Sequence, residues 1–174
     1  MSHSKALPIY NGPADWRGPE IRHAKEWHID LTDSHIQEIK SAVQYSVDRD
    51  VSIVDITPET FPLPHLDKIL QRVYEDLLFG IGLVMFHGMP VQEMSRADII
   101  RAYVGIGSWL GAAVPQNHKG HILGHVKDIG LDHTNPKHRI YGTAHRQPYH
   151  TDSSDIVGLI CLKPAKSGGV FTVS

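Results

Sequence analysis

The segment that most constrains this chain runs from Tyr149 to Asp152, because it places a histidine and an aspartate, His150 and Asp152, two residues apart. Side chains two apart on a β-strand point to the same face of the strand. An imidazole beside a carboxylate supplies two corners of the 2-His-1-carboxylate arrangement, which holds non-haem Fe(II) and leaves open coordination positions. The apolar run 155–162 follows directly. We therefore expect this part of the chain to form strands that carry a metal site.

The His-x-Asp spacing by itself is weak evidence, because the sequence has thirteen histidines and contains the spacing three times. The instance at 28–30 lies just before the first predicted helix. The instance at 65–67 opens the second predicted helix, where residues two apart do not face each other. The instance at 150–152 lies in a predicted strand. The alternative to a metal-binding role there is a polar strand end with no ligand.

The third ligand is the open question, because no histidine follows His150 in the sequence. An earlier histidine is one possible substitute for it, and the candidates are His118, His121, His125 and His145. The spacing of 121 and 125 suits a helical metal pair, but the residues around them favour a strand, where positions four apart also share a face.

The order of predicted elements is helices first and strands later. Residues 1–30 are predicted to form an extended N-terminal arm packed by Trp16 and Trp27, ahead of a domain that covers 31–174. Ser34 and Gln37 have the spacing of a capping box and predict the start of a helix. The apolar period predicts a second helix from about His65 to a stop at Gly80, and Ser95 with Asp98 predicts the start of a third, which runs through about Leu110.

The predicted strands occupy mainly the second half of the chain. They cover 81–86, 121–129, 139–143, 149–152 and 156–162, with an unfinished run from 170. This order favours an α+β fold, or a β-barrel with helical additions, over alternating βαβ units. Cys161 lies within an apolar run, so we expect it in the core rather than at an active site.

Composition narrows the class of protein. The length of 174 residues suits one domain, and the net charge of −2 offers no electrostatic footprint for nucleic acid or anionic lipid. No apolar run is long enough for a membrane span or a signal peptide. A single cysteine fits a reducing compartment, so a cytoplasmic protein is expected.

Several motifs in a fixed order resemble the TauD/TfdA-like family of Fe(II)- and 2-oxoglutarate-dependent dioxygenases. The resemblance covers about residues 28–169 and rests on 82–90, 107–111, 115–117, 139–143, 149–152, 155–162 and 165–169. It implies a double-stranded β-helix, or jelly-roll, core with helices packed outside it. It also implies that His150 and Asp152 are iron ligands, that 2-oxoglutarate and O₂ take the open positions, and that a small organic substrate, expected to be anionic, is hydroxylated.

The resemblance extends to weaker site predictions. Gln116 and Asn117 occupy a position that implies a pocket wall, with loop hydrogen bonding as the alternative. The family places a hydroxyl two residues after the glycine pair 168–169, where this chain has Phe171; Thr172, one position later, is the candidate for contact with the co-substrate.

The family's distal histidine and its 2-oxoglutarate-binding arginine have no counterpart here, so we expect a truncated member whose jelly-roll is incomplete at the C-terminus. The alternative is a non-catalytic fragment that binds metal weakly or acts by pairing with a partner. Unpaired edge strands favour such pairing, or an oligomer.

Overall fold

A computed structural model describes residues 9, 11–117, 119–135, 138 and 140–167. The chain divides into two compact units, one made of Met1–Gly111 with Gly158–Ser174 and the other of Ala112–Val157. Whether residues 31–174 belong to one domain stays a prediction.

The described residues of the first unit form four α-helices: α1 (Gly18–Ile21), α2 (Asp33–Asp48), α3 (Asp67–Phe79) and α4 (Arg96–Ser108). The three longer helices confirm the helices predicted from the apolar period. The stop at Gly80 is also confirmed, since its N–H donates to the carbonyl of Asp76. Ser95 caps α4 as predicted, because its hydroxyl accepts the N–H of Asp98 at 3.1 Å.

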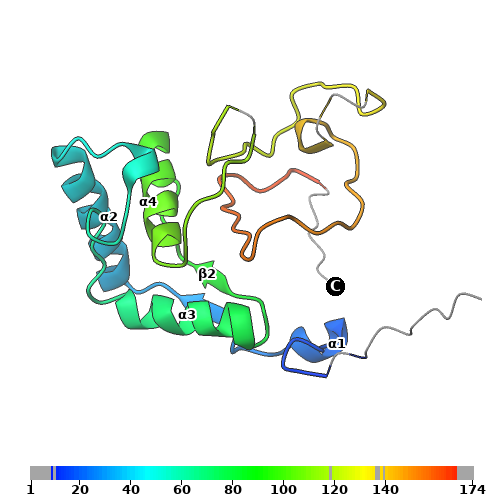
Figure 1. Ribbon diagram of the computed structural model, residues 1–174, viewed down its shortest axis with the longest axis horizontal. Helices are drawn as coiled ribbons and strands as arrows, with labels where there is room; N and C mark the ends of the chain where they lie inside the picture. The colour runs from blue at the N-terminus through cyan, green and yellow to red at the C-terminus, as the bar shows by residue number, and fades with distance from the viewer. Residues whose placement is uncertain (1–8, 10, 118, 136–137, 139, 168–174) are drawn as a thin grey trace, which may run out of the picture. The chain divides into compact units, whose positions relative to one another are not determined.

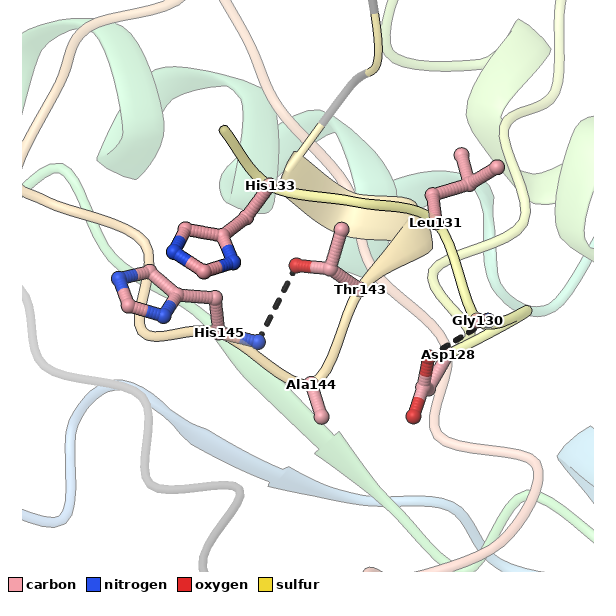
Figure 2. A pocket seen from close by; sticks show the side chains of 7 residues that line it. All are labelled: Asp128, Gly130, Leu131, His133, Thr143, Ala144 and His145. Atoms are coloured by element: carbon pink, nitrogen blue, oxygen red, sulfur yellow. Dashed lines mark hydrogen bonds between the residues drawn. The ribbon is translucent and has the colours of Figure 1, made fainter. Parts of the chain in front are cut away.

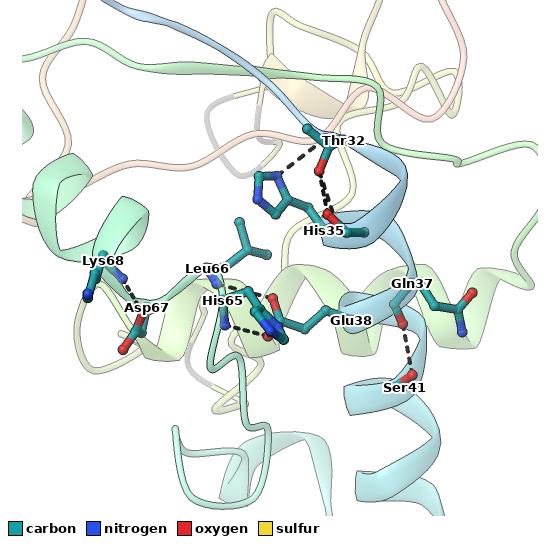
Figure 3. Close-up of polar contacts among 10 residues, drawn as sticks. Thr32, His35, Gln37, Glu38, Ser41, His65, Leu66, Asp67 and Lys68 are labelled. Atoms are coloured by element: carbon teal, nitrogen blue, oxygen red, sulfur yellow. Dashed lines mark hydrogen bonds and ion pairs between the residues drawn. The ribbon is translucent and has the colours of Figure 1, made fainter.

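The predicted start of α2 was wrong by two residues. The cap is Thr32, whose hydroxyl accepts the backbone N–H of His35, while the His35 ring accepts the N–H of Thr32, each at 3.3 Å (Figure 3). Ser34 instead bonds the Thr32 hydroxyl through its own hydroxyl at 2.8 Å. A histidine in place of the usual Glu or Gln closes this capping box, which is why the standard pattern missed it.

The core of the first unit forms where the apolar faces of α2, α3 and α4 meet the loop before α3. α2 packs against α4 (Figure 1). The loop contributes Phe61 and Leu63, both with no exposed surface, and Leu66 is 1% exposed. Ile39 and Val43 of α2 and Leu70 and Val73 of α3 are buried as their helical spacing predicts, whereas Val47 near the end of α2 is exposed.

A two-stranded parallel sheet joins β1 (His28–Asp30) to β2 (Met85–His87), with His28 opposite Met85 and Asp30 opposite His87. β2 lies at the end of the predicted strand 81–86. Within 1–30, predicted to form an extended arm, the described residues form α1 and β1, and the arm itself stays a prediction. Its tryptophans do pack, since the indole N–H of Trp16 donates to the carbonyl of Ile81 at 2.8 Å.

The predicted strands in the second half of the chain were wrong for the described residues, which form no strand between 121 and 162. The 3₁₀ turns are Ile53–Asp55 and, within a predicted strand, Ile140–Gly142. Two backbone hydrogen bonds still link the predicted strands 121–129 and 139–143. The N–H of Lys127 donates to the carbonyl of Tyr141, and the N–H of Ile129 donates to the carbonyl of Gly142. A strand needs a neighbour to satisfy its backbone, and these segments lack a continuous one in the described part of the chain.

Three further predictions concern the jelly-roll core, the place of Cys161 and membrane-spanning helices. The described residues contain helices and one small sheet, so the double-stranded β-helix is not seen in them and stays a prediction. Cys161 is exposed, so its predicted place in the core was wrong. None of the helices in the described residues is long and apolar enough to cross a membrane.

Candidate functional site

His150 lies in an irregular segment of the second unit, and its two ring nitrogens have opposite hydrogen-bonding roles. Nδ1 lies 3.0 Å from the carbonyl oxygen of Pro148, which can only accept, so Nδ1 carries the proton. Nε2 lies 3.1 Å from the amide nitrogen of Gln147, which can only donate. Both contacts therefore select the neutral tautomer in which the lone pair is on Nε2, the form of imidazole that binds metals.

Asp152 lies on the side of the ring that carries this lone pair. Its Oδ1 is 3.9 Å from Nε2 of His150, and the two side chains are 49% and 53% exposed. At that distance and exposure the pair contributes little to stability as an ion pair. An imidazole nitrogen, which accepts a hydrogen bond from Gln147, and a carboxylate oxygen are nonetheless brought together, as the His-x-Asp spacing predicts.

A third ligand is not in place. Among the described residues, no group of three or more His, Cys, Asp or Glu side chains is arranged to hold a metal ion. Of the possible substitutes, the His121 ring lies 3.1 Å from the amide of Asn117, and the His145 ring stacks on that of His133. His118 lies outside the described residues.

The other predicted site residues make local contacts. The side chain of Gln116 donates to the carbonyl of Val114 at 3.0 Å, and Asn117 Oδ1 accepts the backbone N–H of Lys119 at 3.0 Å. These are loop hydrogen bonds, the alternative interpretation of this pair, and a role in a pocket wall stays a prediction. Thr172 and Phe171 lie outside the described residues.

The second unit contains an open cavity of about 390 Å³ (Figure 2). The rings of His133 and His145 stack on one side, with centroids 4.0 Å apart and planes 5° from parallel. Thr143 lies next to them, and its hydroxyl accepts the backbone N–H of His145 at 3.1 Å. In the described part of the unit, the residues that line this cavity do not include His150 or Asp152.

The carboxylate of Asp132, in the second unit, is held by two hydrogen bonds from one neighbour. The backbone N–H and the hydroxyl of Thr134 both donate to its Oδ1, at 2.9 and 2.8 Å. These two bonds, with smaller contributions from His133 and His138, hold the pKa of the Asp132 carboxyl below its usual value. Asp132 is fully exposed, so the shift describes a turn rather than a buried site.

Sequence reasoning missed the support of His150. Gln147 and Pro148 fix its tautomer, and the only signal for them is their position two and three residues before the histidine. Residues that orient a metal ligand through its second nitrogen commonly determine ligand geometry.

Comparison with known proteins places this chain. Residues 48–173 match the model of the taurine catabolism dioxygenase TauD, TfdA family. The chain therefore belongs to the TauD/TfdA family, as the ordered motifs predict. Members of this family are generally dioxygenases that use Fe(II) and 2-oxoglutarate, and the family fold is a jelly-roll.

Two relatives align with nearly the whole chain. FR-33289 synthase of Streptomyces rubellomurinus is 30% identical over 164 residues, which cover 94% of this chain and 48% of the relative. The taurine hydroxylase-like protein SAT17 of Stachybotrys chartarum is 25% identical over 167 residues, which cover 91% of this chain and 43% of that relative. The chain thus spans about half the length of the curated relatives it matches.

The donor atoms present fit part of the family's metal site. One imidazole lone pair and one carboxylate match two corners of a 2-His-1-carboxylate triad, both in ligand type and in softness for Fe(II). The fit is to two protein ligands, since the described residues bring no third one to the pair.

Proposed function

We propose that this chain carries the His-x-Asp part of an Fe(II)- and 2-oxoglutarate-dependent dioxygenase site, with Nε2 of His150 and the carboxylate of Asp152 as iron ligands. The observation that supports it most is the tautomer of His150. The Pro148 carbonyl holds the proton on Nδ1, so the lone pair is on Nε2, the ring nitrogen that lies 3.9 Å from Oδ1 of Asp152. A surface histidine without such a contact interconverts between tautomers and presents no fixed ligand atom.

The reaction proposed is hydroxylation of a small, anionic organic substrate, with succinate and CO₂ as co-products. Fe(II) and 2-oxoglutarate, when bound, supply the activation of O₂ and the oxidation of an unactivated C–H bond. The contribution of the chain is to orient the ligand atoms: the Pro148 carbonyl places the proton on Nδ1 and orients the ring, and Asp152 supplies the negative charge that a dication requires.

The substrate class rests on the relatives. One of them is named as a taurine hydroxylase-like protein, and taurine is a small sulfonate. An anionic substrate is therefore the simplest proposal for this chain. The single cysteine supports a reducing compartment such as the cytoplasm.

A second candidate function is a partner-pairing module without catalysis. Two observations favour it: the described residues bring no third ligand to the pair, and residues 149–162 are exposed or half-buried and form no strand. Backbone N–H and C=O groups that lack a strand partner pair readily with another chain. The experiment below separates the two functions.

The test is an anaerobic titration of the purified chain with Fe(II) in the presence of 2-oxoglutarate, following the visible charge-transfer band of the chelated keto acid. We expect a saturable one-to-one band that is lost in His150→Ala and in Asp152→Ala. The matched control is His65→Ala, because His65 belongs to another His-x-Asp and its side chain is 79% exposed.

Each result of the titration favours one of the two proposed functions. A band that survives His150→Ala would contradict the ligand assignment. A folded chain that gives no band at all would favour the pairing module, which analytical ultracentrifugation of the same sample would then show as a concentration-dependent dimer. Succinate formed from 2-oxoglutarate by this chain would exclude the pairing module as its sole function.

A further inference from the structure

A second pair of histidines lies in the first unit, at the small parallel sheet. Nδ1 of His28 on β1 and Nε2 of His87 on β2 are 2.7 Å apart, although the two residues are 59 positions apart in the chain. Their rings are stacked, with centroids 4.9 Å apart and planes 21° apart. Two ring nitrogens therefore point at each other across the strands.

Neighbouring residues hold this pair of histidines in position. Both histidines are partly buried. The indole of Trp27 lies against the His28 ring, with centroids 3.7 Å apart at a tilt of 38°, and its N–H donates to the carbonyl of Ile21 at 3.1 Å. The tryptophan is thus anchored and restricts the rotation of His28, so the imidazole is pre-oriented toward its partner.

A carboxylate belongs to the same constellation. Asp30 lies two residues after His28 on β1, so the two side chains share a face of the strand, and Asp30 is the register partner of His87. Asp30 is exposed. The His-x-Asp at 28–30, which the sequence puts just before the first predicted helix, is thus the one that lies on a strand in the described residues.

We propose that His28 and His87 form a second metal site, for a divalent ion of the Zn²⁺ type, which ties β1 to β2. Neutral imidazole is a preferred ligand of such ions. Two nitrogens bound tetrahedrally to one Zn²⁺ at about 2.0–2.1 Å lie roughly 3.3 Å apart. The two nitrogens need to separate by only about half an ångström, and the rings need to turn so that both lone pairs point at the ion, which takes the place of the hydrogen-bonding proton.

Asp30 and water complete the coordination in this proposal. The described residues do not already present three metal-binding side chains together, so the carboxylate of Asp30 turns toward the ion when it binds. The site is structural: each strand has only three residues, and an ion between them adds a cross-link that two short strands lack. It does not depend on the iron site proposed at His150 and Asp152.

The test measures Zn²⁺ binding by calorimetry and by the rise in melting temperature, with the whole chain in a background that lacks the other site, His150→Ala with Asp152→Ala. Zn²⁺ should bind one-to-one and raise Tm, because it binds the folded form. His28→Gln and His87→Gln should each weaken binding by more than about tenfold and abolish the Tm shift, and Asp30→Asn should weaken binding less. The matched control is His23→Gln, since His23 is exposed and only five residues from His28.

Two results would overturn the proposal: no one-to-one binding of Zn²⁺, or equal binding in His28→Gln and His23→Gln. Should the histidine variants fail to fold, ¹⁵N NMR of the parent chain decides. Zn²⁺ should shift Nδ1 of His28 and Nε2 of His87 together, and nitrogen shifts that stay unchanged at saturating Zn²⁺ would disprove the site.

Discussion

The carboxylate of Glu38, on α2, binds the backbone of His65 just before α3 begins. Oε1 accepts the N–H of His65 at 2.6 Å and lies 3.1 Å from its ring Nδ1, while Oε2 accepts the N–H of Leu66 at 3.1 Å (Figure 3). The cap residue of α3, Leu66, has no side-chain oxygen of its own. A distant helix thus supplies the negative charge that the start of α3 needs, and this contact fixes α2 against α3.

Replacing Glu38 with glutamine should lower the free energy of unfolding by about 1–3 kcal/mol, because one of the two backbone N–H groups loses its charged acceptor. The Glu38 side chain is only 8% exposed, so water cannot replace the missing oxygen. Urea unfolding measures the change. Glu75→Gln is the control: Glu75 is exposed on α3, and its replacement should change stability by less than about 0.5 kcal/mol.

The helices could be predicted from sequence because a helix satisfies its backbone within one segment, so local period and capping residues carry most of the information. Leu70 and Val73 are buried where the period puts them. The contact of Glu38 with the start of α3 could not be predicted, since it joins positions 27 and 28 residues apart and no local pattern records it.

The close approach of Gly105 to Phe61 gives a second prediction. A Cβ at Gly105 would lie 2.5 Å from ring carbons of Phe61, which has no exposed surface and no room to move. Gly105→Ala should therefore cost about 1–3 kcal/mol from overpacking. Thermal or urea unfolding of the variant measures the loss.

Gly107, in the same helix, provides the matched control. A Cβ there meets nothing within 4 Å, and the position is exposed. Gly107→Ala should raise stability by up to about 1 kcal/mol through helix propensity. If the two alanine variants proved equally stable, the packing of Phe61 against α4 would be refuted.

Tyr103 on α4 should titrate later than an ordinary tyrosine. Burial of the ring raises the pKa of its phenol above the usual 10.0. Its protonated form is favoured by folding, so the stability it contributes is complete below about pH 10 and is lost as the pH rises through the folded pKa, because the unfolded chain releases the proton first. Absorbance at 295 nm should show a late step that is missing in Tyr103→Phe; titration curves of identical shape would argue against burial of the phenol.

The site was predictable only in part. The spacing of His150 and Asp152 correctly indicated that the two side chains come together, because positions two apart stay close in any extended backbone. The predicted strand around them did not form, since a strand depends on a neighbour that the local sequence does not specify. β1 could not be predicted for the same reason, because its partner strand β2 lies more than fifty residues away in the sequence.

The low pKa of Asp132 should depend on Thr134. Thr134→Val removes the hydroxyl bond and keeps the N–H bond, so the pKa of the carboxyl should rise part of the way toward 3.8. Because the folded pKa is depressed, the stabilising contribution is present above about pH 3.8 and is lost as the pH falls through the folded value. NMR titration of the Asp132 carboxyl carbon measures this, and a pKa unchanged by Thr134→Val would assign the shift to the backbone bond alone.

Gln147 gives the last prediction, which concerns the proposed iron site. Its side-chain amide donates to Nε2 of His150, the atom proposed to bind Fe(II), so the metal and Gln147 compete for one lone pair. Gln147→Ala should tighten Fe(II) binding several-fold, since a hydrogen bond of about 1 kcal/mol no longer has to be broken. Anaerobic calorimetry measures the affinity. The control is Gln116→Ala, because the side-chain amide of Gln116 donates to the carbonyl of Val114 and not to a proposed ligand. Weaker binding in Gln147→Ala would show instead that Gln147 holds His150 in place for the metal.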